Sequence, residues 1–159
     1  MIPRGPQGKM LDYVPFYFGY HSPMLYRLHT KQVQDYTEGQ SPLLYLVTTA
    51  QAISEGEQGY VFSDGHGVKK ITKWFDDLID LNKVDWDMVK EKYWTDNNDD
   101  NDRKRRKQAE FLVHGQCAWS LIQEIVVFSE EAKSRVQKIF DSFPSTQHKT
   151  ITVKKKWYY

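Results

Sequence analysis

Apolar residues are grouped along this chain in short runs, each about the length of one strand or one helix. The runs that predict strands are continuous or alternating, and they cover residues 43–47, 60–62, 125–128 and 150–157. Apolar side chains at helical spacing predict helices over residues 74–81, 86–93 and 129–143. A further short helix over residues 49–55 is expected to end at Gly56.

Capping residues support two of these helices. Asp85 precedes the segment 86–93, and Ser129 precedes a segment whose Glu130 and Glu131 suit the positive amino end of a helix. The side chains of that last helix that are expected to face the core are Val136, Ile139, Phe140 and Phe143. Strands and helices mixed in this way predict an α+β fold with a mainly antiparallel sheet and flanking helices.

Three segments between these elements predict irregular structure. Residues 1–8 are rich in Pro and Gly and are expected to be loose. Residues 63–66 (Ser-Asp-Gly-His) predict a turn, and functional groups often lie on such turns. Residues 95–102 are polar and acidic, so they predict an exposed loop.

The cationic run 103–107 (Arg-Lys-Arg-Arg-Lys) leads directly into a strand-like segment that carries a carboxylate at Glu110. Side chains of a strand alternate between its faces, so Gln108 and Glu110 are expected to point the same way. Glu110 is the residue at which we expect the chemistry. The alternative is a solvated strand carboxylate that pairs with the cationic run.

The composition is that of a single globular domain over residues 1–159, with 40% hydrophobic and 27% charged residues. A net charge of +1 predicts that any attraction to nucleic acid comes from local clusters. One cysteine and five scattered histidines form no metal-binding motif, so we expect no metal site. No apolar run is long enough to cross a membrane and no signal peptide is visible, so we expect the protein in the cytoplasm.

The tripeptide Gln108-Ala109-Glu110 resembles the catalytic corner of ADP-ribosyltransferases, in which the Glu contacts the nicotinamide ribose of NAD. Four further stretches make the chain resemble the DarT family: 12–18 (Asp-Tyr-Val-Pro-Phe-Tyr-Phe), 22–26 (Ser-Pro-Met-Leu-Tyr), 61–66 (Val-Phe-Ser-Asp-Gly-His) and 156–159 (Lys-Trp-Tyr-Tyr). DarT enzymes are bacterial toxins that transfer ADP-ribose from NAD to a base of single-stranded DNA, thymidine in the better-known branch. The resemblance therefore implies an ADP-ribosyltransferase-like fold, NAD as co-substrate, and a DarG-like macrodomain antitoxin as partner.

The start of the chain departs from the family pattern. Family members carry an amino-terminal strand with a His-x-Thr motif, implied to hold NAD, and then a basic loop. This chain begins Met-Ile-Pro-Arg-Gly-Pro and reaches the motif at 12–18 without either. We therefore expect a member truncated at its amino end, lacking the NAD-binding strand, so that the residues that bind NAD stay unknown.

The resemblance also implies roles for individual residues. Glu110 would stabilise positive charge on the ribose as the nicotinamide bond breaks. Near the acceptor base would lie Tyr17, Met24 and His66, and near the phosphates Arg103 and Lys104. Each has a structural alternative: the rings of 13–18 can be core, Met24 can fill a gap, and the cationic run can be a solvated face neutralised by neighbouring aspartates.

Three functions follow from these alternatives. The first is an active DNA ADP-ribosyltransferase toxin. The second is an inactive, truncated remnant that still binds single-stranded DNA. The third is a partner-binding or structural fragment that needs its missing segment supplied in trans. NAD turnover that depends on Glu110 distinguishes the first from the other two.

Overall fold

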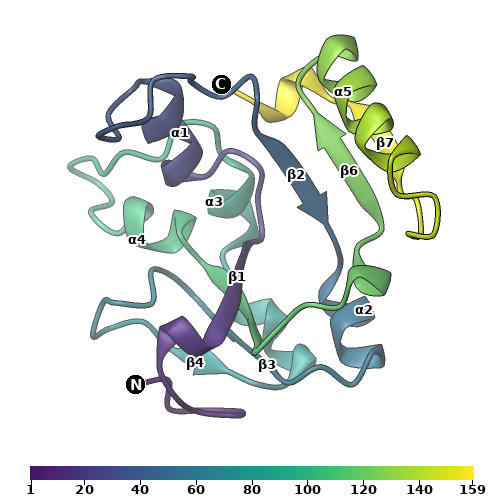
Figure 1. Ribbon diagram of the computed structural model, residues 1–159. Helices are drawn as coiled ribbons and strands as arrows, with labels where there is room; N and C mark the ends of the chain where they lie inside the picture. The colour runs from purple at the N-terminus through teal and green to yellow at the C-terminus, as the bar shows by residue number, and fades with distance from the viewer. The chain divides into compact units, whose positions relative to one another are not determined.

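The computed structural model describes residues 1–159, which divide into two compact units (Figure 1). The first unit comprises residues 1–23 and 50–117, and the second comprises residues 24–49 and 118–159. Each has its own sheet and is described by itself. That these units form one domain stays a prediction. None of the helices combines the length and apolar character that a bilayer span requires.

The first unit is built on a four-stranded antiparallel sheet in the order β1-β5-β3-β4. Its strands are β1 (Tyr13–Tyr17), β3 (Tyr60–Ser63), β4 (Trp74–Phe75) and β5 (Glu110–His114). Strand β5 pairs with β1 along one edge and with β3 along the other. The strand that carries Glu110 is therefore central. The apolar residues Phe111, Leu112 and Val113 favour such a buried position.

Both faces of β5 are covered, so the alternation expected of a half-exposed strand is absent: Glu110 to Val113 are all buried. One face carries aromatic rings, with Phe111 stacked on Tyr60 and on Phe62. On the other face Leu112 joins a core cluster with Ile2, Tyr13 and Val61. A central strand has no solvent side when both faces of its sheet are packed.

Strand β1 lies at one edge of this sheet and contains Pro15, which has no N–H to donate. The amide of His114 donates to Gly59 on the β3 side, so hydrogen bonds to β1 come from the alternate residues of β5. In the β1–β5 register Pro15 lies opposite Leu112, a position whose backbone groups face away from β1. The proline therefore removes no hydrogen bond from the sheet.

The amino-terminal segment is ordered, and the prediction that residues 1–8 are loose was wrong. Ile2 forms an antiparallel bridge with Gly8 and is only 2% exposed, because its side chain packs into the cluster on β3 and β5. Gly5 has a φ of +57°, and a Cβ there would lie 2.6 Å from the side chain of Val61. A glycine at that position lets the turn approach the sheet.

The helices of the first unit are shorter than predicted. Residues 74–81 form no α-helix: Trp74–Phe75 is strand β4, and a 3-10 helix, η2 (Leu78–Lys83), follows Asp77. Strand β4 forms because Trp74 and Phe75 pair with β3 and complete the sheet. The helix after Asp85 is confirmed as α3 (Trp86–Lys90), with the Asp85 side chain accepting from the Met88 amide.

Other local elements of this unit agree with expectation or add to it. The helix over 49–55 is confirmed as α2 (Ala50–Glu55), and residues 95–102 form a loop. A short 3-10 helix, η1 (Met10–Asp12), precedes β1. The cationic run forms a helix, α4 (Arg103–Lys107), that the sequence did not predict.

The second unit holds a three-stranded sheet in the order β2-β6-β7, with helix α5 packed on it. Its elements are α1 (Pro23–His29, which begins at the last residue of the first unit), β2 (Leu44–Val47), η3 (Trp119–Leu121), β6 (Glu124–Val127), α5 (Glu130–Asp141), β7 (Thr150–Val153) and η4 (Lys155–Trp157). β6 and β7 run parallel, and β2 and β6 antiparallel. Two sheets with mostly antiparallel pairing and flanking helices confirm the α+β prediction.

Burial in the second unit is incomplete on the edge strand β2 and along α5. Leu44 and Leu46 on β2 are 43% and 44% exposed, because β2 is an edge strand with one covered face. Ser129 does cap α5, and Val136 and Phe140 face the core. Ile139 and Phe143, which were also expected there, are exposed: Ile139 lies outside the narrower core stripe of α5, and Phe143 lies beyond the end of the helix at Asp141.

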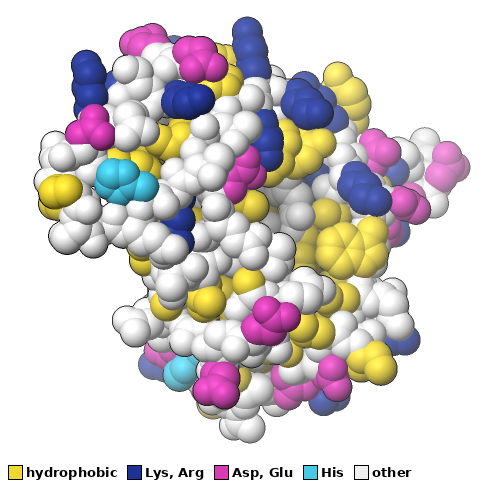
Figure 2. Space-filling view, turned by 90° about the vertical axis from the view of Figure 1, so that its right-hand side faces the viewer, with side chains coloured by type: hydrophobic (Ala, Val, Ile, Leu, Met, Phe, Trp, Pro, Cys, Tyr) yellow, Lys and Arg dark blue, Asp and Glu magenta, His cyan; other side chains and the backbone are white.

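On the face drawn in Figure 2, basic and acidic side chains are interspersed with apolar ones. This agrees with the net charge of +1.

Leu112→Ala is expected to lower the free energy of unfolding by about 2–5 kcal/mol, because the side chain is 1% exposed and leaves a cavity in the sheet. The matched control is Leu11→Ala, where the leucine is 94% exposed and the expected change is below about 0.5 kcal/mol. Urea unfolding of both variants measures the difference. Similar losses in the two variants would contradict the burial described here.

Candidate active site

Glu110 is the first residue of the central strand and is only 8% exposed. Its amide donates to Ser63 Oγ at 3.2 Å, and that hydroxyl donates in turn to the Gly65 carbonyl at 2.7 Å. The carboxylate oxygen Oε2 is buried and accepts no hydrogen bond. A buried carboxylate oxygen without a donor is costly, so the site is suited to a ligand that supplies one.

Burial raises the pKa of Glu110 to about 7, since the charged form loses the solvation that water gives it. The carboxyl is therefore divided between its neutral and ionised forms near neutral pH. The alternative of a solvated carboxylate paired with the cationic run does not hold, because the side chain forms no ion pair and is buried.

Strand register places other polar and aromatic side chains on the same face as Glu110. Tyr17 lies directly opposite it on β1, and its pKa is raised by burial and by the Glu110 charge. On the other side of β5, Phe62 of β3 pairs with Phe111, so the next residue of β3, Ser63, lies beside Glu110. Ser63 in turn pairs with Trp74 on β4. Residues opposite one another share a face of the sheet. Tyr17, Glu110, Ser63 and Trp74 thus form one cross-strand row.

The prediction that Gln108 points to the same face as Glu110 was wrong. It is the carboxyl-terminal cap of α4, with φ −97° and ψ 28°, and its side-chain amide donates to the Lys104 carbonyl at 2.9 Å. Because the chain is still leaving the helix at Gln108, strand alternation starts only at Glu110. The sequence spacing gave no sign that α4 extends this close to the strand.

His66 lies in the predicted turn, which follows β3. Its amide donates to the Arg105 carbonyl at 2.9 Å, and its Nδ1 is buried without a hydrogen-bond partner. Burial lowers the pKa of His66, and the positive charges of Lys69 and Lys104 lower it further. Both effects favour the neutral imidazole, whose buried Nδ1 is left without a hydrogen-bond partner.

Most side chains of the cationic run form ion pairs or hydrogen bonds within the fold. Arg105 donates to Asp64 Oδ1 at 2.9 Å and to Asp102 Oδ2 at 2.7 Å. Arg106 pairs with Asp85 and with Asp100. The alternative of a face neutralised by neighbouring aspartates holds for these two arginines in its pairing with Asp100 and Asp102, but their side chains are largely buried and not solvated. Their guanidinium groups join three segments: the turn after β3, the cap of α3 and the acidic loop.

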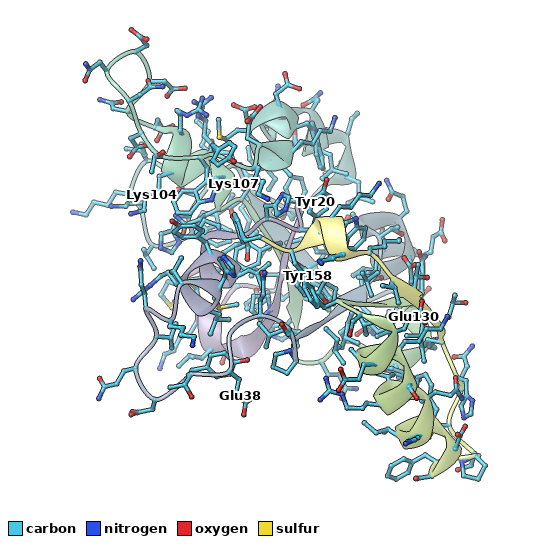
Figure 3. All side chains as sticks on the ribbon, turned by 90° about the horizontal axis from the view of Figure 1, so that it is seen from above. Tyr20, Glu38, Lys104, Lys107, Glu130 and Tyr158 are labelled. Carbon is cyan, nitrogen blue, oxygen red and sulfur yellow. The ribbon has the colours of Figure 1, made fainter.

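The remaining members of the run differ from one another. Lys107 is 4% exposed and donates to the carbonyls of Val89 and Glu91 at the end of α3, and burial lowers its pKa to about 8. Arg103 donates to the carbonyls of Tyr93 and Thr95. Lys104 is exposed and extends away from the fold, whereas Lys107 lies within it (Figure 3). Of the two predicted phosphate contacts, Lys104 is thus the more accessible.

The predicted site residues therefore fall into two groups. The first unit holds Tyr17, His66, Arg103, Lys104 and Glu110. Met24 is 56% exposed on α1 in the second unit, so it does not fill a gap in the core, and its place beside the acceptor base stays a prediction. No group of three or more His, Cys, Asp or Glu side chains is arranged to hold a metal ion.

Comparison with known proteins identifies the family of this site. The family model for the single-stranded DNA thymidine ADP-ribosyltransferase DarT matches residues 1–159. The chain belongs to the DarT family. It is 39% identical to the DNA ADP-ribosyl transferase of Thermus sp. strain 2.9, over 99% of this chain and 74% of that protein. It is also 39% identical to the enzyme of Thermus aquaticus, over 100% of this chain and 68% of that protein.

Solved structures of this family share the fold. The chain matches Thermus sp. 2.9 DarT in complex with NAD+ at a TM-score of 0.93 and 39% identity, covering 99% of this chain and 78% of that one. The same enzyme in complex with ADP-ribosylated single-stranded DNA matches at 0.93 and 38%, over 99% of this chain and 74% of that one. These matches confirm the predicted ADP-ribosyltransferase-like fold and the family resemblance.

Sequence reasoning missed three residues that support the site. Ser63 is fully buried and binds the Glu110 amide, Asp64 holds Arg105, and Lys107 ties α4 to α3. Ser63 and Asp64 had a signal in the predicted turn, since polar residues that end a buried strand often hydrogen-bond nearby backbone. Lys107 had none, because it is one of five consecutive cations.

Glu110→Gln is expected to raise the free energy of unfolding by about 1–2 kcal/mol at pH 8, because it removes a buried charge. Burial raises the folded-state pKa from an ordinary 4.5 to about 7. Between pH 4.5 and about 7 the unfolded chain loses the Glu110 carboxyl proton while the folded protein keeps it. The free energy of unfolding therefore falls as the pH rises through this range, and the loss is complete above about pH 7.

The measurement is urea unfolding at pH 4.5 and at pH 8, with Glu57→Gln, an exposed glutamate, as control. The gain from Glu110→Gln should be small at the lower pH and the control should show little change at either. A gain independent of pH would contradict the buried, raised-pKa carboxyl.

Proposed function

We propose that this chain transfers ADP-ribose from NAD to thymidine in single-stranded DNA, with Glu110 as the catalytic residue. The observation that carries the proposal is the buried carboxylate oxygen of Glu110, unpaired on the central strand of a DarT-family fold. The Thermus sp. 2.9 relative has been solved in complex with NAD+ and in complex with ADP-ribosylated single-stranded DNA. The ligands of that enzyme thus agree with the chemistry available here.

The unpaired oxygen of Glu110 fits a ribose hydroxyl, which is a hydrogen-bond donor. NAD supplies the ribosyl group, and positive charge develops on its sugar as the bond to nicotinamide breaks. An ionised Glu110 fixed by strand pairing stabilises that charge without first having to reorient. Tyr17, opposite Glu110, covers the same site with a ring whose hydroxyl stays protonated, because its pKa is raised.

The acceptor base also needs recognition. Thymine carries a proton on its ring nitrogen at neutral pH, and this proton must leave when the nitrogen is modified. The neutral imidazole of His66 has an unpaired Nδ1 that can accept a hydrogen bond from such a group. We assign the base contacts to Tyr17, Met24 and His66, and phosphate contacts to Arg103 and Lys104.

The cellular setting follows from the family resemblance. We propose that the protein acts as the toxin of a toxin–antitoxin pair in the cytoplasm, where its DNA target is present. The proposed partner is a DarG-like macrodomain antitoxin that removes ADP-ribose from the modified base. The motifs at 12–18, 22–26, 61–66 and 156–159 support this part of the proposal.

Glu110→Gln is expected to reduce transfer of ADP-ribose to a thymidine-containing single-stranded oligonucleotide by about 10²-fold or more. The neutral amide keeps the shape of the side chain but cannot offset the developing positive charge. Mass spectrometry of the oligonucleotide after incubation with NAD detects the adduct. Glu57→Gln is the matched control and should retain parental activity.

Two controls define the outcome. An oligonucleotide in which every thymidine is replaced should receive no adduct from the parent protein. An adduct formed equally by the parent and by Glu110→Gln would refute the role of Glu110. Absence of an adduct from the parent at any DNA concentration would refute the activity of this chain.

The pH dependence of kcat/KM for NAD gives an independent prediction. Only ionised Glu110 can stabilise the sugar cation, and its pKa in the free enzyme is about 7. We expect kcat/KM to rise about tenfold per pH unit below that value and to level off above it. Any residual activity of Glu110→Gln should lack this limb, and a parental profile flat from pH 5 to 8 would contradict the assignment.

A further inference from the structure

A second basic segment lies next to His66. Between His66 and Trp74 the chain carries three lysines and no carboxylate: Lys69, Lys70 and Lys73. We call residues 66–73 the lysine loop. All three lysines are exposed, and none takes part in the ion pairs that hold the aspartates of this unit. Their charges are therefore available to a ligand.

The lysine loop is fixed to helix α4. The His66 amide donates to the Arg105 carbonyl at 2.9 Å, and the Thr72 hydroxyl donates to the His66 carbonyl at 2.8 Å. A Cβ at Gly65 would lie 2.9 Å from the Arg105 carbonyl oxygen, so the glycine permits this close approach of the two backbones. The three lysines thus lie on a loop whose backbone is fixed by hydrogen bonds to α4 and within the loop.

The charges of the loop and of α4 meet at His66. Lys69 from the loop and Lys104 from α4 both act on the imidazole, and each contributes to its lowered pKa. Two cations from different segments therefore lie within electrostatic range of a residue that we assign to the acceptor base. The phosphates next to that base carry the opposite charge.

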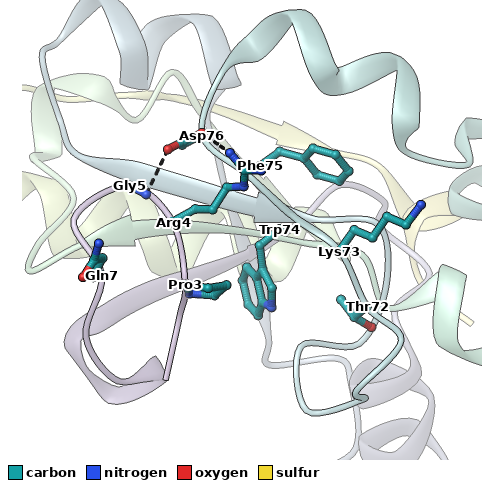
Figure 4. Close-up of a pocket in the computed structure, with 9 residues that line it drawn as sticks. All are labelled: Pro3, Arg4, Gly5, Gln7, Thr72, Lys73, Trp74, Phe75 and Asp76. Atoms are coloured by element: carbon teal, nitrogen blue, oxygen red, sulfur yellow. Dashed lines mark hydrogen bonds and ion pairs between the residues drawn. The ribbon is translucent and has the colours of Figure 1, made fainter.

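Apolar and aromatic surface accompanies these lysines. Val68, directly before Lys69, is 66% exposed, and Ile71, between Lys70 and Lys73, is 68% exposed. A groove of about 680 Å³ adjoins the end of the loop, with Lys73 and Trp74 along one side and Pro3 and Arg4 along the other (Figure 4). Trp74 belongs to the cross-strand row of Glu110. Cations beside flat apolar surface are the combination that binds single strands.

We propose that the lysine loop is a second DNA-binding surface, at which Lys69, Lys70 and Lys73 bind phosphates of nucleotides that flank the target base. The strand then continues toward the groove at Trp74. This inference rests on the proposed function, since it names where the same DNA substrate is held. It differs from the expectation drawn from the sequence, which placed phosphate binding only on the run 103–107.

The test removes the three charges together, as Lys69→Gln, Lys70→Gln and Lys73→Gln. Binding of a fluorescent single-stranded oligonucleotide of about 12 nucleotides is measured by anisotropy, without NAD, as a function of salt. The affinity should fall about tenfold or more, and the slope of log K against log salt should decrease by about 2, since each phosphate contact contributes about 0.7. The matched control removes three other exposed lysines, as Lys31→Gln, Lys83→Gln and Lys90→Gln, and should lose less than about twofold.

Transfer of ADP-ribose by the same variants separates this inference from the proposed function. The KM for DNA should rise in the loop variant while the KM for NAD stays unchanged. If the parent modifies thymidine and the loop variant matches the control in affinity and salt slope, the inference is overturned and the function stands. If the parent neither binds nor modifies single-stranded DNA, the proposed function fails, and the lysine loop fails with it.

Discussion

The pairing of β5 on both of its edges is the constraint on which the rest of the first unit depends. Hydrogen bonds to β1 and β3 fix the strand, and covered faces exclude water from Glu110 at its start. A carboxylate at such a position cannot relax toward solvent. Its raised pKa and its unpaired oxygen are two consequences of the same burial.

The cations around this strand divide into structural and available groups. Arg105 and Arg106 form ion pairs with aspartates, and Lys107 donates to carbonyls at the end of α3. The Arg105–Asp64 pair holds the turn that carries His66 against helix α4, and the contacts of Arg106 and Lys107 hold α4 against α3 and the acidic loop. A tight run of five cations therefore functions mainly as a framework, and the more dispersed lysines beside it keep their charges for a ligand.

A buried carboxylate without a hydrogen-bond donor lowers the free energy of unfolding, and the function that we propose for Glu110 requires it. The site residues of the first unit come from a strand start, an edge strand, a turn and a short helix, and the backbone contacts between these elements decide their spacing. Substitutions in Ser63 or Asp64 would act on the site through position, because both residues hold its parts together.

The sequence by itself determined the α+β class, the strands at 60–62 and 125–128, the caps Asp85 and Ser129, and the motifs of the DarT family. These depend on local periodicity, capping chemistry and motif order, which are readable along one chain. Tertiary structure alone decided that Trp74–Phe75 is a strand, that Ile2 is buried, and that Gln108 caps a helix. It also decided which cations are free. The reason is physical: pairing partners and desolvation come from residues distant in sequence, such as Asp64 for Arg105, and no local pattern encodes them.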